Sequence, residues 1–177
     1  MTFGKRVARL RRVISREKAD ALLVTNLTNI AYLTGFKGSF GLLLATLKET
    51  LFLTDFRYIE TAQDEVFADE VIRTSSSHFE DVKRETKKRK VRRLGFEGRA
   101  LSHADYLELA EKVGEKRLAP VKDAVEKLRT IKDDEEVALL RRAVKLTEKG
   151  LRHIRALLEP GFSNGMSPYP SSHGGTI

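Results

Sequence analysis

The chain has 177 residues, with 33 lysines and arginines against 25 aspartates and glutamates, and its formal net charge at pH 7 is +8. It has no cysteine, which excludes disulfide bonds, thiolate catalysis and thiolate metal sites, and we expect a protein of the reducing cytoplasm. No run is apolar enough for a secretory signal or a membrane span, so no membrane partner is expected.

The first third of the chain predicts a helix followed by three short strands. Residues 4–18 place apolar side chains at helical spacing with arginines on the opposite face, as in an amphipathic helix that packs on a sheet. Three apolar runs follow that are too short for helices and are bounded by turn signals, which is typical of buried strands. These runs are residues 21–25, 41–47 and 50–54. Residues 29–33 predict a short helix that ends at Gly35, because glycine suits a positive φ.

The second strand has no polar residue between Leu42 and Leu44, so we expect it to be covered on both faces. It joins the third strand around Lys48 and Glu49, which predicts a hairpin. The hairpin makes at least one pair of neighbouring strands antiparallel.

From residue 55 to residue 121 the chain alternates helices with strands. Helices are expected over residues 57–66, 78–88 and 102–113, and strands over residues 70–73, 91–96 and 117–121. Asp55 is well placed to cap the first of these helices, Ser75-Ser76-Ser77 offers caps for the second, and Ser102 starts the third. The alternation predicts an α/β fold with a mixed six-stranded sheet and helices on both faces.

Three blocks of sequence stand out by their order and spacing. The first is Asn-Ile-Ala-Tyr-Leu-Thr-Gly-Phe at residues 29–36, followed by Gly38-Ser39, and the second is Thr-Asp-Phe-Arg-Tyr at residues 54–58. The third is Leu-Arg-Thr-Ile-Lys at residues 128–132, followed by Glu135-Glu136. Together they resemble the N-terminal domain of the creatinase, prolidase and Xaa-Pro aminopeptidase family. The resemblance implies that residues 1–128 adopt that domain's mixed-sheet fold.

From Asp133 the chain changes in character. The resemblance makes residues 129–161 the link into a catalytic domain and the first helix of that domain. Four acidic residues at positions 133–136 suit the start of a helix, and Pro160-Gly161 ends it. Apolar side chains recur at the a and d positions of three heptads, with Thr147 as a polar interruption. These side chains are Val137, Leu140, Val144, Leu151, Ile154 and Leu158.

The resemblance implies that a catalytic domain would cover this apolar stripe, and we expect that cover to be absent from this chain. We expect the stripe to pair with a second copy of the chain, giving a homodimer, or to meet a catalytic domain of the family. Folding back on residues 1–128 and an exposed, frayed helix are the alternatives.

Residues 162–177 are rich in glycine, serine and proline, which predicts disorder. The resemblance stops at Gly161. Its abrupt end favours a truncated or frameshifted product of the family, and the sequence leaves a stand-alone domain open as well.

Metal ligands are not expected in this chain. The resemblance implies that the family's peptidases hold two divalent ions, for example manganese, with two Asp, one His and two Glu of the missing domain. The four histidines are His78, His103, His153 and His173, and none has a second ligand at zinc spacing. We therefore expect no catalytic residue, no cofactor in this chain and no peptidase activity from it alone.

The best candidate site is the glycine-rich loop after the short helix, with the end of the third strand. It comprises Gly35, Phe36, Lys37, Gly38, Ser39, Phe40, Arg57 and Tyr58. In dimeric members of the resembled family the corresponding loop reaches the partner's active-site mouth and helps to hold the substrate. Arg57 suits bidentate contact with a carboxylate. The alternative is local: the phenylalanines and Tyr58 pack on the core, and Arg57 ties a helix start to the sheet.

Residues 83–93 hold eight basic residues and one acid. Such a run predicts weak, sequence-blind attraction to nucleic acid, so a basic module that associates with nucleic acid is the second functional hypothesis. No aromatic residue is interleaved to stack on bases. A solvated helix face is the alternative interpretation.

Overall fold

The computed structural model describes residues 3–157 and divides the chain into two units, Met1–Lys132 and Asp133–Ile177. The first unit contains the sheet. The second contains one long helix, α7 (Asp134–Leu157). Three predictions lie outside the described residues: Leu158 as part of the apolar stripe, the helix stop at residues 160–161 and the disordered tail at residues 162–177.

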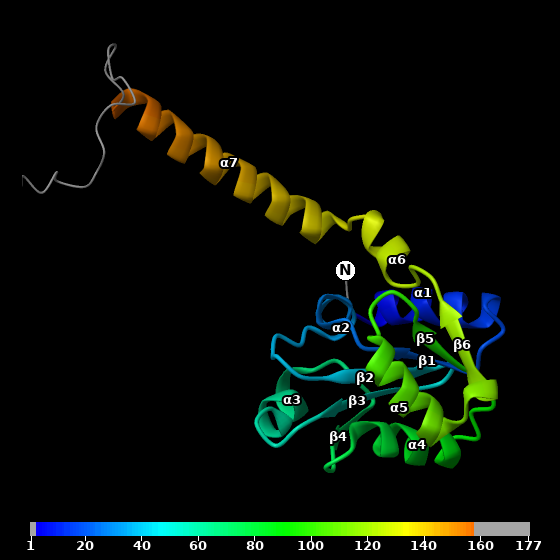
Figure 1. Cartoon of the computed structure of the whole chain (residues 1–177). Coiled ribbons are helices and arrows are strands. Elements are labelled where there is room, and N and C mark those ends of the chain that lie inside the picture. The colour runs from blue at the N-terminus through cyan, green and yellow to red at the C-terminus, as the bar shows by residue number, and fades with distance from the viewer. Residues whose placement is uncertain (1–2, 158–177) are drawn as a thin grey trace, which may run out of the picture. The chain divides into compact units, whose positions relative to one another are not determined.

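A six-stranded sheet forms the centre of the first unit, in the order β4-β3-β2-β1-β5-β6 (Figure 1). The strands are β1 (Ala21–Val24), β2 (Leu42–Thr46), β3 (Thr50–Thr54), β4 (Glu70–Arg73), β5 (Leu94–Glu97) and β6 (Leu118–Val121). β2 runs antiparallel to both of its neighbours, and the other pairs are parallel. The predicted mixed six-stranded sheet, with a hairpin between the second and third strands, is confirmed.

Helices cover both faces of the sheet. On one face lie α1 (Phe3–Arg16), α2 (Leu27–Thr34) and α3 (Ile59–Glu65) (Figure 1). On the other lie α4 (His78–Lys88) and α5 (His103–Val113). A short 3-10 helix, η1 (Glu115–Arg117), leads into β6, and α6 (Glu126–Thr130) is the last helix of the first unit.

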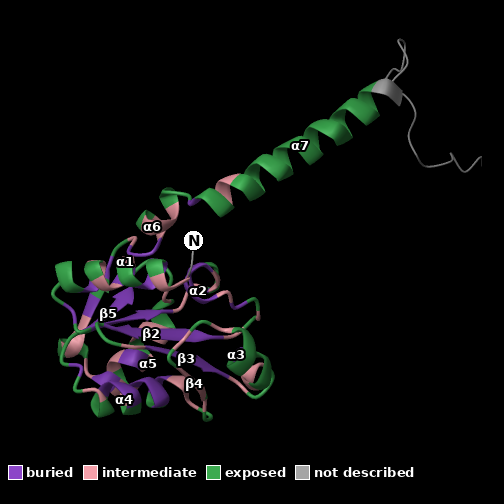
Figure 2. Cartoon of the chain, turned by 180° about the vertical axis from the view of Figure 1, so that it is seen from behind, coloured by how far each residue is buried: buried purple, intermediate pink, exposed green. Residues whose placement is uncertain are grey.

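The central strands β1, β2 and β3 are buried along their whole length, as Figure 2 shows for β2 and β3. Successive side chains of a strand point to opposite faces of the sheet. Leu43 therefore belongs to the core under α1 and α2, whereas Leu42 and Leu44 belong to the core under α4 and α5. The leucine run is covered on both faces, as predicted, because it contributes to two cores at once.

Two serine caps lie where the sequence predicts them. The hydroxyl oxygen of Ser77 accepts a hydrogen bond from the backbone N–H of Glu80 at the start of α4. Ser102 does the same for the N–H of Asp105 at the start of α5. Both bonds satisfy a backbone donor that has no partner inside its helix.

The prediction that Asp55 caps the helix after β3 is wrong. α3 begins only at Ile59, and the residue before it, Tyr58, makes no capping bond. Asp55 instead accepts a hydrogen bond of 2.9 Å from the backbone N–H of Arg57, which folds the chain into a turn before the helix starts. An aspartate two residues before a free N–H forms such a turn readily.

The two edges of the sheet carry different connections. The strands β1, β3, β4, β5 and β6 all end at one edge, which is also where β2 begins. We call this the carboxyl edge, and the opposite one the amino edge. The candidate loop before β2 and the turn after β3 both lie at the carboxyl edge, which is the edge where open α/β sheets bind ligands.

The second unit begins with a reciprocal cap. The N–H of Asp133 donates to Glu136 Oε2, and the N–H of Glu136 donates to Asp133 Oδ1, each at 3.0 Å. α7 exposes more apolar side chains than the predicted stripe contains, because Leu139 and Leu146 are 63% and 72% exposed. None of the helices described, α7 included, is long and apolar enough to cross a membrane.

Candidate functional site

The loop between α2 and β2, residues 35–41, is built around Phe36. This side chain is buried, and its ring centroid lies 4.6 Å from that of Phe52 and 5.6 Å, edge to face, from that of Tyr58. Gly35 turns the chain into the loop with φ of 84°, and a Cβ there would lie 2.9 Å from the ring of Phe3. Only glycine fits this position without strain.

Two further glycines let the loop lie directly on aromatic rings. A Cβ added at Gly38 would lie 2.3 Å from the ring of Phe36, and one at Gly41 would lie 2.6 Å from the ring of Phe52. Both distances are far below van der Waals contact. The surface that these glycines approach in this structure is the chain's own aromatic core.

Hydrogen bonds fasten the loop to the end of β3. Ser39 Oγ and Tyr58 Oη lie 2.8 Å apart, and Thr54 Oγ1 donates to the carbonyl oxygen of Phe40 at 2.8 Å. The bond from Ser39 lowers the pKa of the Tyr58 phenol. The loop is therefore held at both its aromatic anchor and its tip.

Arg57 pairs with a carboxylate of its own turn. Its Nε and Nη2 donate to Asp55 Oδ2 at 3.0 and 2.6 Å. The guanidinium holds the pKa of Asp55 below its usual value, and the carboxylate raises the pKa of Arg57. The side chain of Arg57 remains 51% exposed, and its Nη1 makes no hydrogen bond within residues 3–157. The arginine is fixed in direction, with one side left for a second contact.

Phe56 is an exposed residue of this edge that the sequence analysis missed. It is 68% exposed, whereas Phe36 and Phe52 beneath the loop are buried. A signal for it was present, since Phe56 lies past the end of the strand and between two charged residues. Large aromatic side chains in solvent are a feature of binding surfaces. Lys37 is exposed on the neighbouring loop.

Two hollows flank the loop. One, of about 290 Å³, lies toward α3 and is lined in part by Lys37, Arg57 and Tyr58. The other, of about 270 Å³, lies toward α4 and α5 and is lined in part by Phe40 and His78, whose rings meet edge to face at 5.6 Å. The loop thus forms a wall between two concave surfaces.

A buried polar cluster, which the sequence analysis did not predict, joins α2 to β5 and α6. The fully buried Asn29 donates through Nδ2 to Glu97 Oε1 and to Glu126 Oε1, each at 2.6 Å. Its Oδ1 accepts from Arg129 Nη1 at 2.9 Å. Both amide hydrogens and the amide oxygen of one side chain are therefore in use. An asparagine on the apolar side of a short helix was the available signal.

Glu97 is the most enclosed carboxylate of the cluster, at 4% exposure. Its Oε2 accepts from the backbone N–H of Thr25 at 2.7 Å and of Asn26 at 2.8 Å. Burial raises the pKa of Glu97 above its usual value, although these hydrogen bonds oppose the shift. The cluster fastens the end of β1 to β5 at the carboxyl edge.

The basic run at residues 83–93 is less available than its sequence suggests. The side chain of Arg89 is only 9% exposed and pairs with Glu49, Glu70 and Glu85. The solvated-face interpretation is wrong for this residue, because the hairpin, β4 and α4 surround it with carboxylates. Lys83 and Arg84 also form ion pairs. Five cations of the run are exposed and form no ion pair with any residue that the structure describes: Lys87, Lys88, Lys90, Arg92 and Arg93.

The residues described here do not fit a metal ion. Between residues 3 and 157, no three His, Asp or Glu side chains are grouped so as to hold one. The histidines at 78, 103 and 153 are far apart in the sequence and share no cluster.

Comparison with known proteins decides the family. A family model described as the Creatinase/Prolidase N-terminal domain matches residues 6–131. The chain belongs to this family. Its creatinase/prolidase N-terminal domain therefore comprises nearly all of the first unit.

Two relatives of this chain are more than twice the length of the part that matches it. The uncharacterized peptidase YqhT of Bacillus subtilis (strain 168) is 34% identical over 158 residues, which are 89% of this chain and 45% of that protein. The Xaa-Pro dipeptidase from Bacillus anthracis matches with a TM-score of 0.84 and 30% identity, over 92% of this chain and 45% of that one. The chain thus spans less than half the length of both.

A third relative is a domain of matching size. The N-terminal domain of the cytoplasmic peptidase PepQ from Mycobacterium tuberculosis H37Rv matches with a TM-score of 0.63 and 28% identity, over 70% of this chain and 98% of that one.

The creatinase/prolidase N-terminal domain brings the three sequence blocks together in two places. The first and second blocks meet where Ser39 bonds to Tyr58. The first and third meet where Arg129 bonds to Asn29. The blocks that carry the resemblance are therefore contact points of one tertiary structure, at one edge of the sheet.

Proposed function

We propose that this chain is the non-catalytic N-terminal part of an Xaa-Pro aminopeptidase- or dipeptidase-like protein, and that its carboxyl edge caps the substrate site of a catalytic domain. The observation that carries the proposal is the fixed loop with exposed groups on it. Phe36 is buried as an anchor, while Lys37, Phe56 and Arg57 are exposed beside it.

A cap of this kind gains from being rigid before it meets its target, because ordering a loop on binding costs free energy. Gly35, Gly38 and the Ser39–Tyr58 bond supply that rigidity. The exposed groups suit a peptide that ends in proline. A cation such as Lys37, or the open Nη1 of Arg57, suits a carboxylate, and the ring of Phe56 suits an apolar pyrrolidine.

The metal ions of the reaction belong, in this proposal, to the catalytic domain. The two divalent ions, for example manganese, would be held there by that domain's carboxylates and histidine, and would polarise the scissile carbonyl and activate water. This chain would position substrate and exclude water. The absence of cysteine supports a cytoplasmic setting for such a protein.

A second part of the proposal concerns the helix α7, to which we assign a role in oligomerisation. The side chains of Leu140, Val144, Leu151 and Ile154 are each more than half exposed on it. An apolar stripe of this length favours association with a second copy through the a and d positions.

A second candidate function is weak association with nucleic acid. The five exposed cations left in the run at residues 83–93 favour it. Such binding would be sequence-blind and would fade by physiological salt, because it rests on counterion release.

A chimaeric enzyme tests the capping proposal. Residues 1–157 would be joined to the part of the Bacillus anthracis Xaa-Pro dipeptidase that this chain does not match, and assayed with manganese on an Xaa-Pro dipeptide. We expect activity from the chimaera and none from this chain alone. Lys37→Ala and Phe56→Ala should each raise KM about tenfold, which corresponds to about 1.4 kcal/mol. Lys48→Ala, an exposed lysine in the turn between β2 and β3 at the amino edge, is the control.

Two results would contradict the proposal. Turnover by this chain alone, above a blank without protein, would show that the chain is itself catalytic. An active chimaera whose KM is the same in all three variants would show that the loop does not touch the substrate.

A further inference from the structure

The outer face of α1 carries four cations in a single row. They follow one another at intervals of four, three and four residues, and at 100° per residue they fall within about 60° of the helix circumference. The row is about 16 Å long at 1.5 Å per residue. It consists of Lys5, Arg9, Arg12 and Arg16. The opposite side of α1 is buried in the core of the first unit through Val7, Leu10 and Ile14.

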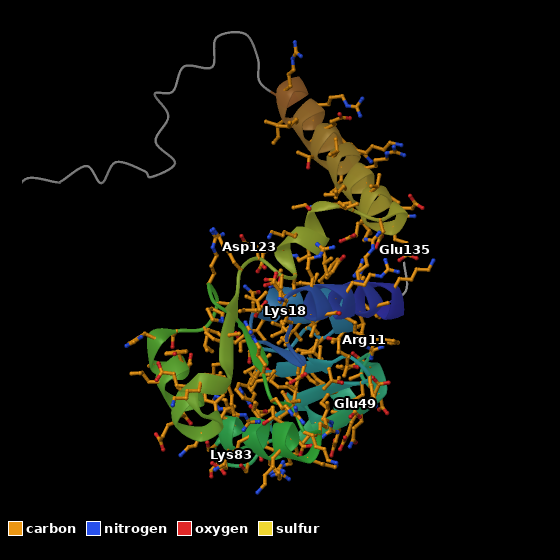
Figure 3. The ribbon with its side chains drawn as sticks, turned by 90° about the vertical axis from the view of Figure 1, so that its right-hand side faces the viewer. Arg11, Lys18, Glu49, Lys83, Asp123 and Glu135 are labelled. Carbon is orange, nitrogen blue, oxygen red and sulfur yellow. The ribbon has the colours of Figure 1, made fainter. Side chains whose placement is uncertain are left out.

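No carboxylate neutralises this α1 row. The helix itself contains no aspartate or glutamate, and between residues 3 and 157 no member of the row forms an ion pair. Arg11, which lies on the sheet side of the helix in Figure 3, behaves differently: it donates to the carbonyl of Thr46 at 3.3 Å and lies 3.7 Å from Asp69. Arg9 is half-exposed and the other three members are exposed. The α1 row is therefore a group of surface cations that no described carboxylate of the chain neutralises.

The row continues past the end of the helix onto the amino edge. Lys18, labelled in Figure 3 just beyond α1, is exposed and has a φ of 53°. Two residues later, the carboxylate of Asp20 accepts hydrogen bonds from the backbone N–H groups of Arg92 and Arg93 at 2.8 and 2.9 Å. These bonds bring two exposed arginines of the basic run to the end of the α1 row. They also engage the carboxylate of Asp20, which leaves Glu17 as the one exposed acid between Arg16 and Lys18.

We infer that the α1 row, Lys18, Arg92 and Arg93 form one basic belt that binds the phosphate backbone of nucleic acid. The inference rests on the second candidate function and places its contact surface mainly on α1, away from the run at residues 83–90. Three of the four cations in the row are arginines, whose planar guanidinium groups suit phosphate oxygens. The belt has no aromatic residue to stack on bases, so it reads backbone charge and not sequence.

A membrane surface fits the belt less well than nucleic acid does. Amphipathic helices that bind bilayers insert their apolar face among the acyl chains. The apolar face of α1 is closed off, because Leu10 and Ile14 are at most 2% exposed within the core. Contact with a bilayer would be left to headgroup charge alone.

The salt dependence of DNA binding tests the belt. Affinity of the full chain for a short DNA duplex would be measured by fluorescence anisotropy between about 50 and 200 mM salt. The triple variant Arg9→Gln, Arg12→Gln, Arg16→Gln should lower the slope of log K against log salt by about 2.7, at about 0.9 per lost phosphate contact. A matched triple variant, Lys112→Gln, Lys122→Gln, Lys127→Gln, should keep the slope of the wild type.

The possible results separate the belt from the function on which it rests. One result would overturn the belt but keep the association with nucleic acid. In it, the α1 variant binds DNA like the wild type, and the triple variant Lys87→Gln, Lys88→Gln, Lys90→Gln no longer shows the salt dependence of the wild type. Both are overturned if the wild type does not bind the duplex at about 50 mM salt. Binding to vesicles of anionic lipid, without binding to DNA, overturns the choice of nucleic acid. Circular dichroism of each variant shows that the fold is kept.

Discussion

Asn29 and Arg129 stand 100 residues apart in the chain and are joined by a hydrogen bond of 2.9 Å. The bond links α2, which leads into the candidate loop, to α6, which closes the first unit. The same asparagine holds Glu97 at the end of β5 and Glu126 at the start of α6. One buried amide therefore connects three segments that approach the carboxyl edge from different parts of the sequence.

Asn29→Ala should lower the free energy of unfolding by about 3 kcal/mol, because it removes three hydrogen bonds and leaves two carboxylates without this donor. Asn26→Ala is the matched control. It removes the amide that caps the same helix through two backbone N–H groups, and should cost about 1 kcal/mol. Urea unfolding followed by circular dichroism measures both. Equal losses for the two variants would mean that the cluster contributes no more than a cap.

Glu97→Gln should change how stability depends on pH. The folded state raises the pKa of Glu97, so it holds a proton that the unfolded chain, with a value of about 4.3, has already lost. The contribution of Glu97 to stability is therefore fully present below about pH 4.3 and declines as the pH rises through the raised value.

The variant lacks this titration. The free energy of unfolding of the wild type should therefore exceed that of the variant by more at about pH 5 than at about pH 7. Unfolding in urea at the two pH values gives the difference directly. If the difference in free energy of unfolding between wild type and variant grows toward neutral pH, the folded state lowers this pKa instead.

Gly35→Ala should destabilise the first unit by about 2 kcal/mol, since an alanine at φ of 84° is strained and its Cβ would lie 2.9 Å from the ring of Phe3. Gly4→Ala is the control. Gly4 lies inside α1, and a Cβ there would make an ordinary contact of 3.5 Å with the ring of Phe67. We expect Gly4→Ala to leave the thermal midpoint unchanged or slightly higher. A Gly35→Ala protein as stable as Gly4→Ala would contradict the close packing of the loop on α1.

Arg89→Met should lower the free energy of unfolding by about 3 kcal/mol, because it leaves Glu49, Glu70 and Glu85 without their shared cation. Lys88→Met, one residue earlier and exposed, should stay within about 0.5 kcal/mol of the wild type. Chemical denaturation of the pair decides between an arginine that stabilises the fold and one that serves only as surface charge. Similar small losses would support the second role.

The double variant Leu140→Glu, Leu151→Glu should convert a dimer into a monomer and leave the first unit folded, because both side chains lie on the a and d seam of α7. Leu139→Glu, Leu146→Glu adds the same charges on exposed positions off the seam, and should keep the dimer. Analytical ultracentrifugation at tens of micromolar measures all three proteins. A monomeric wild type would refute pairing, and loss of the dimer in both variants would mean that the contact is wider than the seam.

Most of the secondary structure follows from local pattern. Short apolar runs predicted the three central strands, the serine run at 75–77 and Ser102 predicted two helix starts, and Gly35 predicted the end of α2. Each of these signals acts within a few residues, through side-chain periodicity, a capping hydroxyl or the freedom of φ. The family resemblance was also visible at this level, because its blocks are short and contiguous.

The functional detail was decided by the tertiary structure. Asp55 looked like a helix cap and instead holds Arg57, and Arg89 looked like surface charge and instead is enclosed by Glu49, which is 40 residues away. Asn29 found partners 68, 97 and 100 residues away. A periodic pattern says which side of an element is buried, but it does not say which charge or amide lies opposite. That depends on the order of strands in the sheet, and pairing across such distances leaves no local trace in the sequence.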